Sequence, residues 1–172
     1  MATEQPEKER VFDVERSKRE TRDAFANRAM IYYYLFDEMR KHFGLEEAKH
    51  VFMLAIRRRG RDIGAKYAGA ASARDFEAVA ETFVAGSPCE GELFEPAVIE
   101  VGQDSCTLSM SACPLVEAWR EMGLDDEEVA LMCTMAAEID FATFESAGLE
   151  VRFDEKIGEG ARRCVLTIRD VG

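Results

Sequence analysis

The chain contains no hydrophobic run near the roughly 20 residues that a membrane-spanning helix requires. Its first ten residues, MATEQPEKER, are polar and lack the apolar segment of a secretory signal peptide. Such a composition is typical of a disordered tail, which we expect over residues 1–15. The sequence therefore predicts a cytoplasmic protein without a membrane partner.

Positive charge is also scarce. The chain has 22 lysines and arginines against 34 aspartates and glutamates, which gives a formal net charge of −12. Binding to nucleic acid needs a positive field, so this balance argues against a nucleic-acid partner. One exception is RRRGR, residues 57–61, which is either a solvated helix face that balances nearby acids or a local anion site.

The five cysteines form no Cys-x-x-Cys pair, which removes the usual support for a zinc ribbon or a thioredoxin-type motif. An odd number of cysteines without a signal peptide predicts free thiols in a reducing compartment. No linker rich in proline or serine and no repeat of fixed period divides the chain. We therefore expect a single domain over residues 16–172.

The first half of the chain has helical periodicity. Apolar residues three and four apart predict one helix over residues 16–43 and a second over residues 45–69. Ser72 is expected to cap a third, shorter helix. Gly60 and Gly64 lie one turn apart in the second helix, and they predict the close approach of a neighbouring backbone.

The period changes in the second half. The segments FEPAVIEVG and SCTLSMSAC flank Gln103 and Asp104 and predict a β-hairpin. Pro114 can begin the next helix, and Asp125 can cap another over residues 126–145. The closing segments LEVRFDEKI and RRCVLTIRD, joined at GEGA, predict a second hairpin.

This order of elements defines the expected fold class. A helical half, residues 16–85, precedes a mixed half, residues 93–172. Strand pairs separated by helices indicate an α+β domain, with N-terminal helices followed by two β-hairpins that form one antiparallel sheet with helices between them.

Three cysteines occupy positions where chemistry is plausible. Cys113 precedes the proline that begins a helix, and the free N–H groups there would favour a thiolate. Cys133 and Asp140 are seven residues apart, so they would share one helix face and flank a small ligand. Cys164 lies on the last strand. The alternative is that these thiols are small hydrophobic residues of the core.

Two further interpretations remain open. Cys113, Cys133 and Cys164 could hold zinc together with Asp140 or a histidine, although their spacing matches no zinc signature. Arg28 stands among apolar residues, one turn before Tyr32, and an inward arginine would need a carboxylate from Asp140 or from a substrate. Otherwise Arg28 extends to solvent at the edge of the apolar stripe.

Several segments, taken in order, resemble the L-2-amino-thiazoline-4-carboxylic acid hydrolase family. They are NRAMIYYYLFDEM, HFGLEEA with GRDIG, CPLVEAWREMG, LMCTMAAEID and GEGARRCVLTI, between residues 20 and 169. The resemblance implies a hydrolase that opens a cyclic C–N bond in a thiazoline carboxylate and yields a carbamoyl-cysteine-type product. It implies Cys113, Cys133, Asp140 and Cys164 as catalytic candidates, with Arg28 and Tyr32 binding the substrate and no cofactor.

The closing half is also similar to the 4-vinyl reductase domain group. That likeness implies an alternative function, a non-enzymatic small-molecule-binding or sensor domain that uses the same pocket for a hydrophobic ligand. In either case the expected partner is a small molecule. The exposed part of the first helix could also pair two chains into a homo-oligomer.

Overall fold

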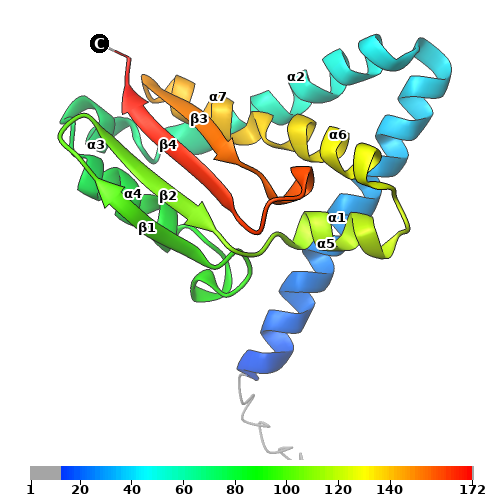
Figure 1. Ribbon diagram of the computed structural model, residues 1–172, viewed down its shortest axis with the longest axis horizontal. Coiled ribbons are helices and arrows are strands. Elements are labelled where there is room, and N and C mark those ends of the chain that lie inside the picture. Colours follow the sequence, from blue (N-terminus) through cyan, green and yellow to red (C-terminus); the bar gives the residue numbers. More distant parts are fainter. Residues whose placement is uncertain (1–12, 172) are drawn as a thin grey trace, which may run out of the picture.

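The computed structural model describes residues 13–171, and Figure 1 shows helices gathered on one side of a small sheet. The helices are α1 (Val14–Phe43), α2 (Leu45–Gly64), α3 (Ala68–Ser72), α4 (Phe76–Ala85), α5 (Pro114–Glu121), α6 (Asp126–Ala136) and α7 (Glu138–Ser146). The strands are β1 (Pro96–Val101), β2 (Ser105–Met110), β3 (Leu149–Glu155) and β4 (Cys164–Asp170). Two short 3-10 helices, η1 (Cys89–Gly91) and η2 (Ile157–Glu159), lie in connections. The α+β class is confirmed.

The long first helix begins slightly earlier than predicted. The Asp13 carboxylate accepts a hydrogen bond from the Arg16 N–H at 3.0 Å, and this cap starts α1 at Val14. Gly44, at a φ of 84°, ends it. Residues 1–12 of the predicted tail lie outside the described residues, whereas Val14 and Glu15 belong to the helix.

The prediction for the second and third helices is wrong in detail. α2 ends at Gly64, and Ser72 is the last residue of the separate helix α3 rather than an N-cap. The cap of α4 is Asp75, whose carboxylate accepts from the Ala78 N–H at 2.9 Å. Arg74 has a left-handed φ of 54°, which turns the chain out of α3 just before this cap.

The predicted helix over residues 126–145 is two helices. Asp125 caps the first as expected, accepting from the Glu128 N–H at 2.9 Å. The chain turns at Ala137, where the Asp140 N–H bonds the Ala137 carbonyl in a tight 2.9 Å contact. Cys133 and Asp140 therefore lie on different helices, not on one shared helix face.

The two hairpins join into one antiparallel sheet of order β1-β2-β4-β3. The central pairing sets Cys106 of β2 opposite Ile168 and Leu108 opposite Leu166 of β4. All four side chains are buried on the face that α4 and α7 cover. The first hairpin predicted from the sequence is thus present, with β2 as its second strand.

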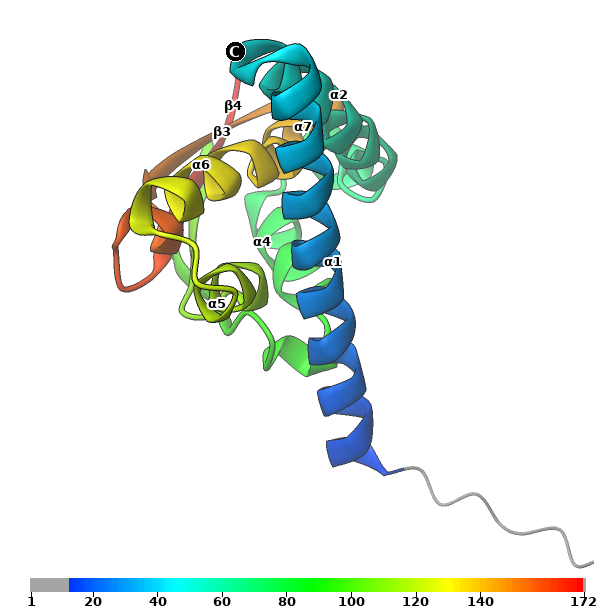
Figure 2. The same ribbon diagram turned by 90° about the vertical axis from the view of Figure 1, so that its right-hand side faces the viewer.

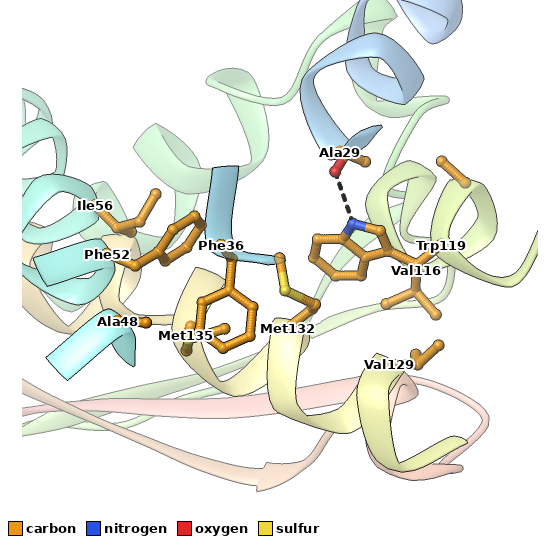
Figure 3. Close-up of a cluster of buried hydrophobic side chains, with 11 residues drawn as sticks. Ala29, Phe36, Ala48, Phe52, Ile56, Val116, Trp119, Val129, Met132 and Met135 are labelled. Carbon is orange, nitrogen blue, oxygen red and sulfur yellow. Dashed lines mark hydrogen bonds between the residues drawn. The ribbon is translucent and has the colours of Figure 1, made fainter. Parts of the chain in front are cut away.

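A second core lies among the helices, and Figure 3 shows its side chains. Trp119 of α5 is fully buried, and its indole N–H donates to the Ala29 carbonyl of α1 at 2.9 Å. Figure 2 shows α1 passing beside α5 and meeting α2 at one end, in agreement with the packing of these helices. The protein thus has one core among helices and another beneath the sheet.

The two glycines of α2 bring α7 very close. A Cβ on Gly60 would lie 2.8 Å from the Ala142 Cβ and would also overlap the Ile139 carbonyl. The Thr143 hydroxyl donates to the Gly60 carbonyl at 3.1 Å across this contact. The close backbone approach expected at these glycines is confirmed.

The charged segment at residues 57–61 divides between two roles. Arg57 bonds Glu138 at 2.7 Å and also Glu145, so it balances acids on α7 as the first interpretation predicts. Arg59 instead lies at the wall of the cavity described below. No helix among residues 13–171 combines the length and the apolarity needed to cross a membrane.

Candidate functional site

A cavity of about 420 Å³ lies between the helical core and the sheet. Its wall takes residues from nearly every element, starting with Phe25 on α1 and ending with Cys164 on β4. Five of the six candidate residues from the sequence line it: Arg28, Cys113, Cys133, Asp140 and Cys164. Residues that the sequence places in separate motifs therefore line one common cavity in the fold.

Asp140 is the acidic group of this space. It sits in the first turn of α7, directly after the bend at Ala137, and this bend directs it to the cavity wall. Burial raises the pKa of its carboxyl group from 3.8 to about 7. Near neutral pH the group is therefore divided between acid and carboxylate, which suits proton transfer in either direction.

The three thiols of the cavity are weak acids. Burial raises the pKa of Cys113 to about 12 and that of Cys133 to about 11, and it also raises the pKa of Cys164. The N–H groups of Val116 and Leu115 do lower the pKa of Cys113, as its position before α5 predicts. Their effect is smaller than that of burial, so the expected thiolate at this helix start is not supported.

The turn η2 packs against two of these thiols. A Cβ on Gly158 would lie 2.6 Å from the Cys133 sulfur, so only glycine fits against this side chain. The Ile157 N–H points at the Cys164 sulfur at 3.4 Å. The glycine-rich turn that carried part of the family resemblance thus holds two of the candidate cysteines in place.

Two buried polar atoms among residues 13–171 lack a hydrogen-bond partner, and both belong to the cavity wall. They are Nε of Arg28 and Oγ of Ser87. The Arg28 guanidinium lies 4.2 Å from the centre of the Phe25 ring and forms no ion pair with Asp140. A buried N–H donor without a partner is costly, so an anionic ligand group that accepts from Nε would stabilise Arg28.

The structure does not bring Tyr32 to the cavity wall. Its ring packs edge-on against Phe52 in the helical core, with 5.4 Å between ring centres. The Arg28 guanidinium lies 5.9 Å from the centre of the Tyr32 ring. Tyr32 thus lies next to Arg28 but outside the cavity wall. We therefore do not assign Tyr32 a direct contact with the substrate.

Sequence reasoning missed several residues of the wall. Tyr67 lines the cavity, and burial together with nearby Asp140 raises its pKa to about 12. Ser87 lies in a loop with no motif around it, and Lys156 follows β3. Of these three residues, only Tyr67 has a sequence feature that could have indicated its position, because it follows closely after Gly60 and Gly64.

The zinc alternative receives no geometric support. Within residues 13–171, no three histidine, cysteine or acidic side chains come together in a way that could hold a metal ion. All five cysteines are free thiols. Three of them, Cys113, Cys133 and Cys164, line the cavity.

Fold and site together define an α+β domain with a cavity lined by one acid of raised pKa, one arginine whose Nε has no hydrogen-bond partner, and three thiols. Residues 24–168 match the model of the L-2-amino-thiazoline-4-carboxylic acid hydrolase family. The chain belongs to this family, as its motifs predicted. No curated protein matches the sequence.

Solved structures share the fold at low sequence identity. One is a trafficking protein particle complex subunit 3 from Naegleria fowleri, covalently bound to palmitic acid, with a TM-score of 0.56 and 13% identity over 85% of this chain and 94% of that one. Another is the phenol-responsive sensory domain of the transcription activator PoxR with phenol, with a TM-score of 0.58 and 14% identity over 85% of this chain and 74% of that one. These likenesses concern the fold alone.

Proposed function

We propose that this protein is a hydrolase of a small cyclic C–N substrate of the L-2-amino-thiazoline-4-carboxylate type. Family membership supports the reaction class. The mechanism rests on Asp140, whose carboxyl group has a pKa raised to about 7 and lies in the same cavity as Arg28, whose Nε has no hydrogen-bond partner.

Substrate binding begins at Arg28. Its guanidinium can donate two parallel hydrogen bonds to a carboxylate, and Nε is the donor that has no partner in the protein. The Ser87 hydroxyl is the other unsatisfied polar group of the wall and can donate to the same ligand. Binding a carboxylate here would remove the cost of two buried, unpaired groups.

Asp140 then activates water. The carbon between the two nitrogens and the sulfur of the ring is electrophilic, and water adds to it as the Asp140 carboxylate takes the water proton. Asp140 gives this proton to the ring nitrogen of the former C=N bond. Asp140 then takes the hydroxyl proton of the tetrahedral intermediate and passes it to the same nitrogen, as the C=O bond forms and the ring C–N bond breaks. One water is consumed, the acid returns to its starting state, and the product is a carbamoyl-cysteine-type compound.

The thiols take no nucleophilic part in this mechanism. With pKa values of about 12 and about 11, Cys113 and Cys133 are almost wholly protonated near neutral pH, and a thiol is a far weaker nucleophile than a thiolate. We assign them to the packing of the pocket wall, where a small polarisable side chain fits against the ring sulfur. This revises the sequence-based hypothesis that Cys113 attacks the substrate.

The test is turnover of L-2-amino-thiazoline-4-carboxylate by the purified chain, followed by mass spectrometry of the carbamoyl-cysteine-type product. We expect Asp140→Asn to lower kcat by at least ~100-fold, the usual loss when a general acid–base residue is removed. Cys113→Ser and Cys133→Ser should each retain kcat within a few-fold. Arg28→Lys should raise KM much more than it lowers kcat, because lysine keeps the charge but loses the paired donors.

The variants also separate the two mechanisms. A Cys113→Ser chain as inactive as Asp140→Asn would restore the cysteine nucleophile and contradict the role given to water. Absence of turnover by the folded wild-type chain would contradict this substrate.

The competing function is a binding or sensor domain. The solved sensory domain of PoxR, which holds phenol, has the same fold, and much of the cavity wall of this chain is aromatic or aliphatic. A binding domain would retain ligands unchanged. The turnover assay therefore distinguishes the two functions directly.

A further inference from the structure

We propose that the natural ligand of this cavity is an anionic amphiphile, a carboxylate-bearing head joined to an apolar substituent about the size of a phenyl ring. This inference uses the site of the proposed function and names the class of substrate that the site accepts. It predicts that the bare thiazoline carboxylate is a minimal substrate that leaves part of the cavity empty.

The volume of the cavity gives the first argument. A thiazoline carboxylate has about nine non-hydrogen atoms, and even at the ~30 Å³ that a whole water molecule occupies in the liquid they would fill at most about 270 Å³. The cavity measures about 420 Å³. It falls within the ~300–1,000 Å³ of pockets that bind larger organic ligands.

The nature of the wall gives the second argument. Three rings that line the cavity are each held by a further ring: Phe25 by Phe94 at 5.4 Å, Phe83 by Phe144 at 6.5 Å, and Phe153 by Phe141 at 5.7 Å. Rings fixed in this way form a preformed apolar surface. An apolar surface of this kind favours a ligand that removes it from water.

The charges of the wall give the third argument. Asp140 is the one carboxylate among the residues that the structure places along the cavity, against four basic side chains, namely Arg28, Arg59, Lys66 and Lys156. Arg59 and Lys156 are partly balanced by Asp62 at 3.9 Å and Glu159 at 2.7 Å, but Arg28 Nε has no partner. In a chain of net charge −12, this local excess of positive charge selects an anionic head.

The single tryptophan of the chain reports on the cavity, because Trp119 lines it. We would titrate the full-length protein with propanoate, 3-phenylpropanoate and neutral 3-phenylpropanamide and follow Trp119 fluorescence. We expect 3-phenylpropanoate to bind at least ~10-fold tighter than propanoate, as burial of a phenyl ring predicts. The amide should bind at least ~10-fold more weakly than 3-phenylpropanoate, because it cannot form a charged pair with Arg28.

A matched pair of variants locates the apolar part of the ligand. Thr82 of α4 lines the cavity, whereas Thr134 of α6 is exposed outside it. Thr82→Phe should weaken 3-phenylpropanoate at least ~10-fold while it changes propanoate little, because the new ring occupies the same space. Thr134→Phe, the same change on another helix, should leave both affinities unaltered.

Each outcome bears on one claim. Equal affinities for propanoate and 3-phenylpropanoate, or an amide that binds as tightly as the acid, would overturn the amphiphile. Graded binding without any turnover of a thiazoline carboxylate would reject the proposed hydrolase yet support the amphiphile. Turnover of a thiazoline carboxylate, together with equal affinities for propanoate and 3-phenylpropanoate, would support the hydrolase and reject the amphiphile.

Discussion

At the residue scale, burial rather than position along a helix sets the acidity of the cavity groups. Cys113 occupies the helix start that favours a thiolate, yet its pKa is raised because the sulfur is buried away from water. The same loss of solvation acts on Asp140 with a useful result, since it moves a carboxyl group into the range of neutral pH. The sequence reveals helix position directly, but it does not reveal how deeply a residue is enclosed.

The raised pKa of Asp140 predicts a particular dependence of stability on pH. Between the ~3.9 of an unfolded aspartate and about 7, the folded chain holds a proton that the unfolded chain releases. The free energy of unfolding therefore loses this contribution as pH rises through that range. The Asp140→Asn variant has no such group to titrate, so its free energy of unfolding should not fall in this way. The difference in free energy of unfolding, variant minus wild type, should therefore rise by about 1–3 kcal/mol as the pH is raised from 4.5 to 8.

Urea unfolding of both chains at the two pH values measures this difference. The control is Glu127→Gln, a change of the same kind at an exposed position in the first turn of α6. Its relative stability should vary by less than ~0.5 kcal/mol over the same range. Parallel behaviour of Asp140→Asn and the wild type would contradict the raised pKa.

The buried thiols make a second prediction at this scale. Iodoacetamide reacts with thiolates, so Cys113 and Cys133 should stay unmodified at pH 8 and react only well above it or in urea. Peptide mapping by mass spectrometry measures the rate at each cysteine. Cys89, in the connection after α4, is the internal comparison and should react first. Rapid labelling of Cys113 at pH 7 would show that its thiolate is accessible.

At the element scale, the periodic segments were predictable and the connections were not. The spacing of apolar residues predicted α1, because one face of the helix packs against a core, and the segments on either side of Gln103 and Asp104 predicted the hairpin that contains β2. The break after Gly64 and the bend at Ala137 contain no proline that would have predicted them, and they border the two helices, α2 and α7, that pack closely together. These two unpredicted turns matter because the second one carries Asp140 to the cavity wall.

The contact between α2 and α7 predicts opposite effects for similar substitutions. Gly60→Ala and Gly64→Ala place a methyl group against the backbone of α7 and should each lower the free energy of unfolding by about 1–3 kcal/mol. Gly69→Ala, in α3, meets no atom within 4 Å and should raise stability by up to about 1 kcal/mol through helix propensity. Thermal and urea unfolding of the three variants would check the signs. A neutral Gly60→Ala would show that the two helices can separate at little cost.

At the scale of the whole molecule, the distribution of charge matters more than its sum. The sequence predicted from its net charge of −12 that the protein avoids polyanions. It did not predict that basic side chains from α1, α2 and the segment after β3 converge on one cavity, because only the tertiary fold brings them together. An acidic protein can thus hold a site for a small anion.

The salt dependence of affinity should show whether the basic cavity wall or the negative net charge dominates the interaction with an anionic ligand. Attraction to the basic wall predicts that affinity for 3-phenylpropanoate falls a few-fold between 20 and 500 mM sodium chloride, since screening acts within about 10 Å at moderate salt. Repulsion by the net charge would give the opposite sign. Titrations of Trp119 fluorescence at several salt concentrations measure the slope, and the neutral amide, whose affinity should not change, is the control.

The wall of the cavity has a consequence for how the protein is made. It draws on Phe25 near the beginning of the described chain and on Cys164 close to its end. During synthesis the ribosome releases the N-terminal helices long before β4, so the growing chain has no complete pocket until the last strand has emerged and paired with β2. A ligand that needs the whole wall can therefore bind only chains that have completed β4, and capture by an immobilised ligand would separate them from chains terminated before that strand.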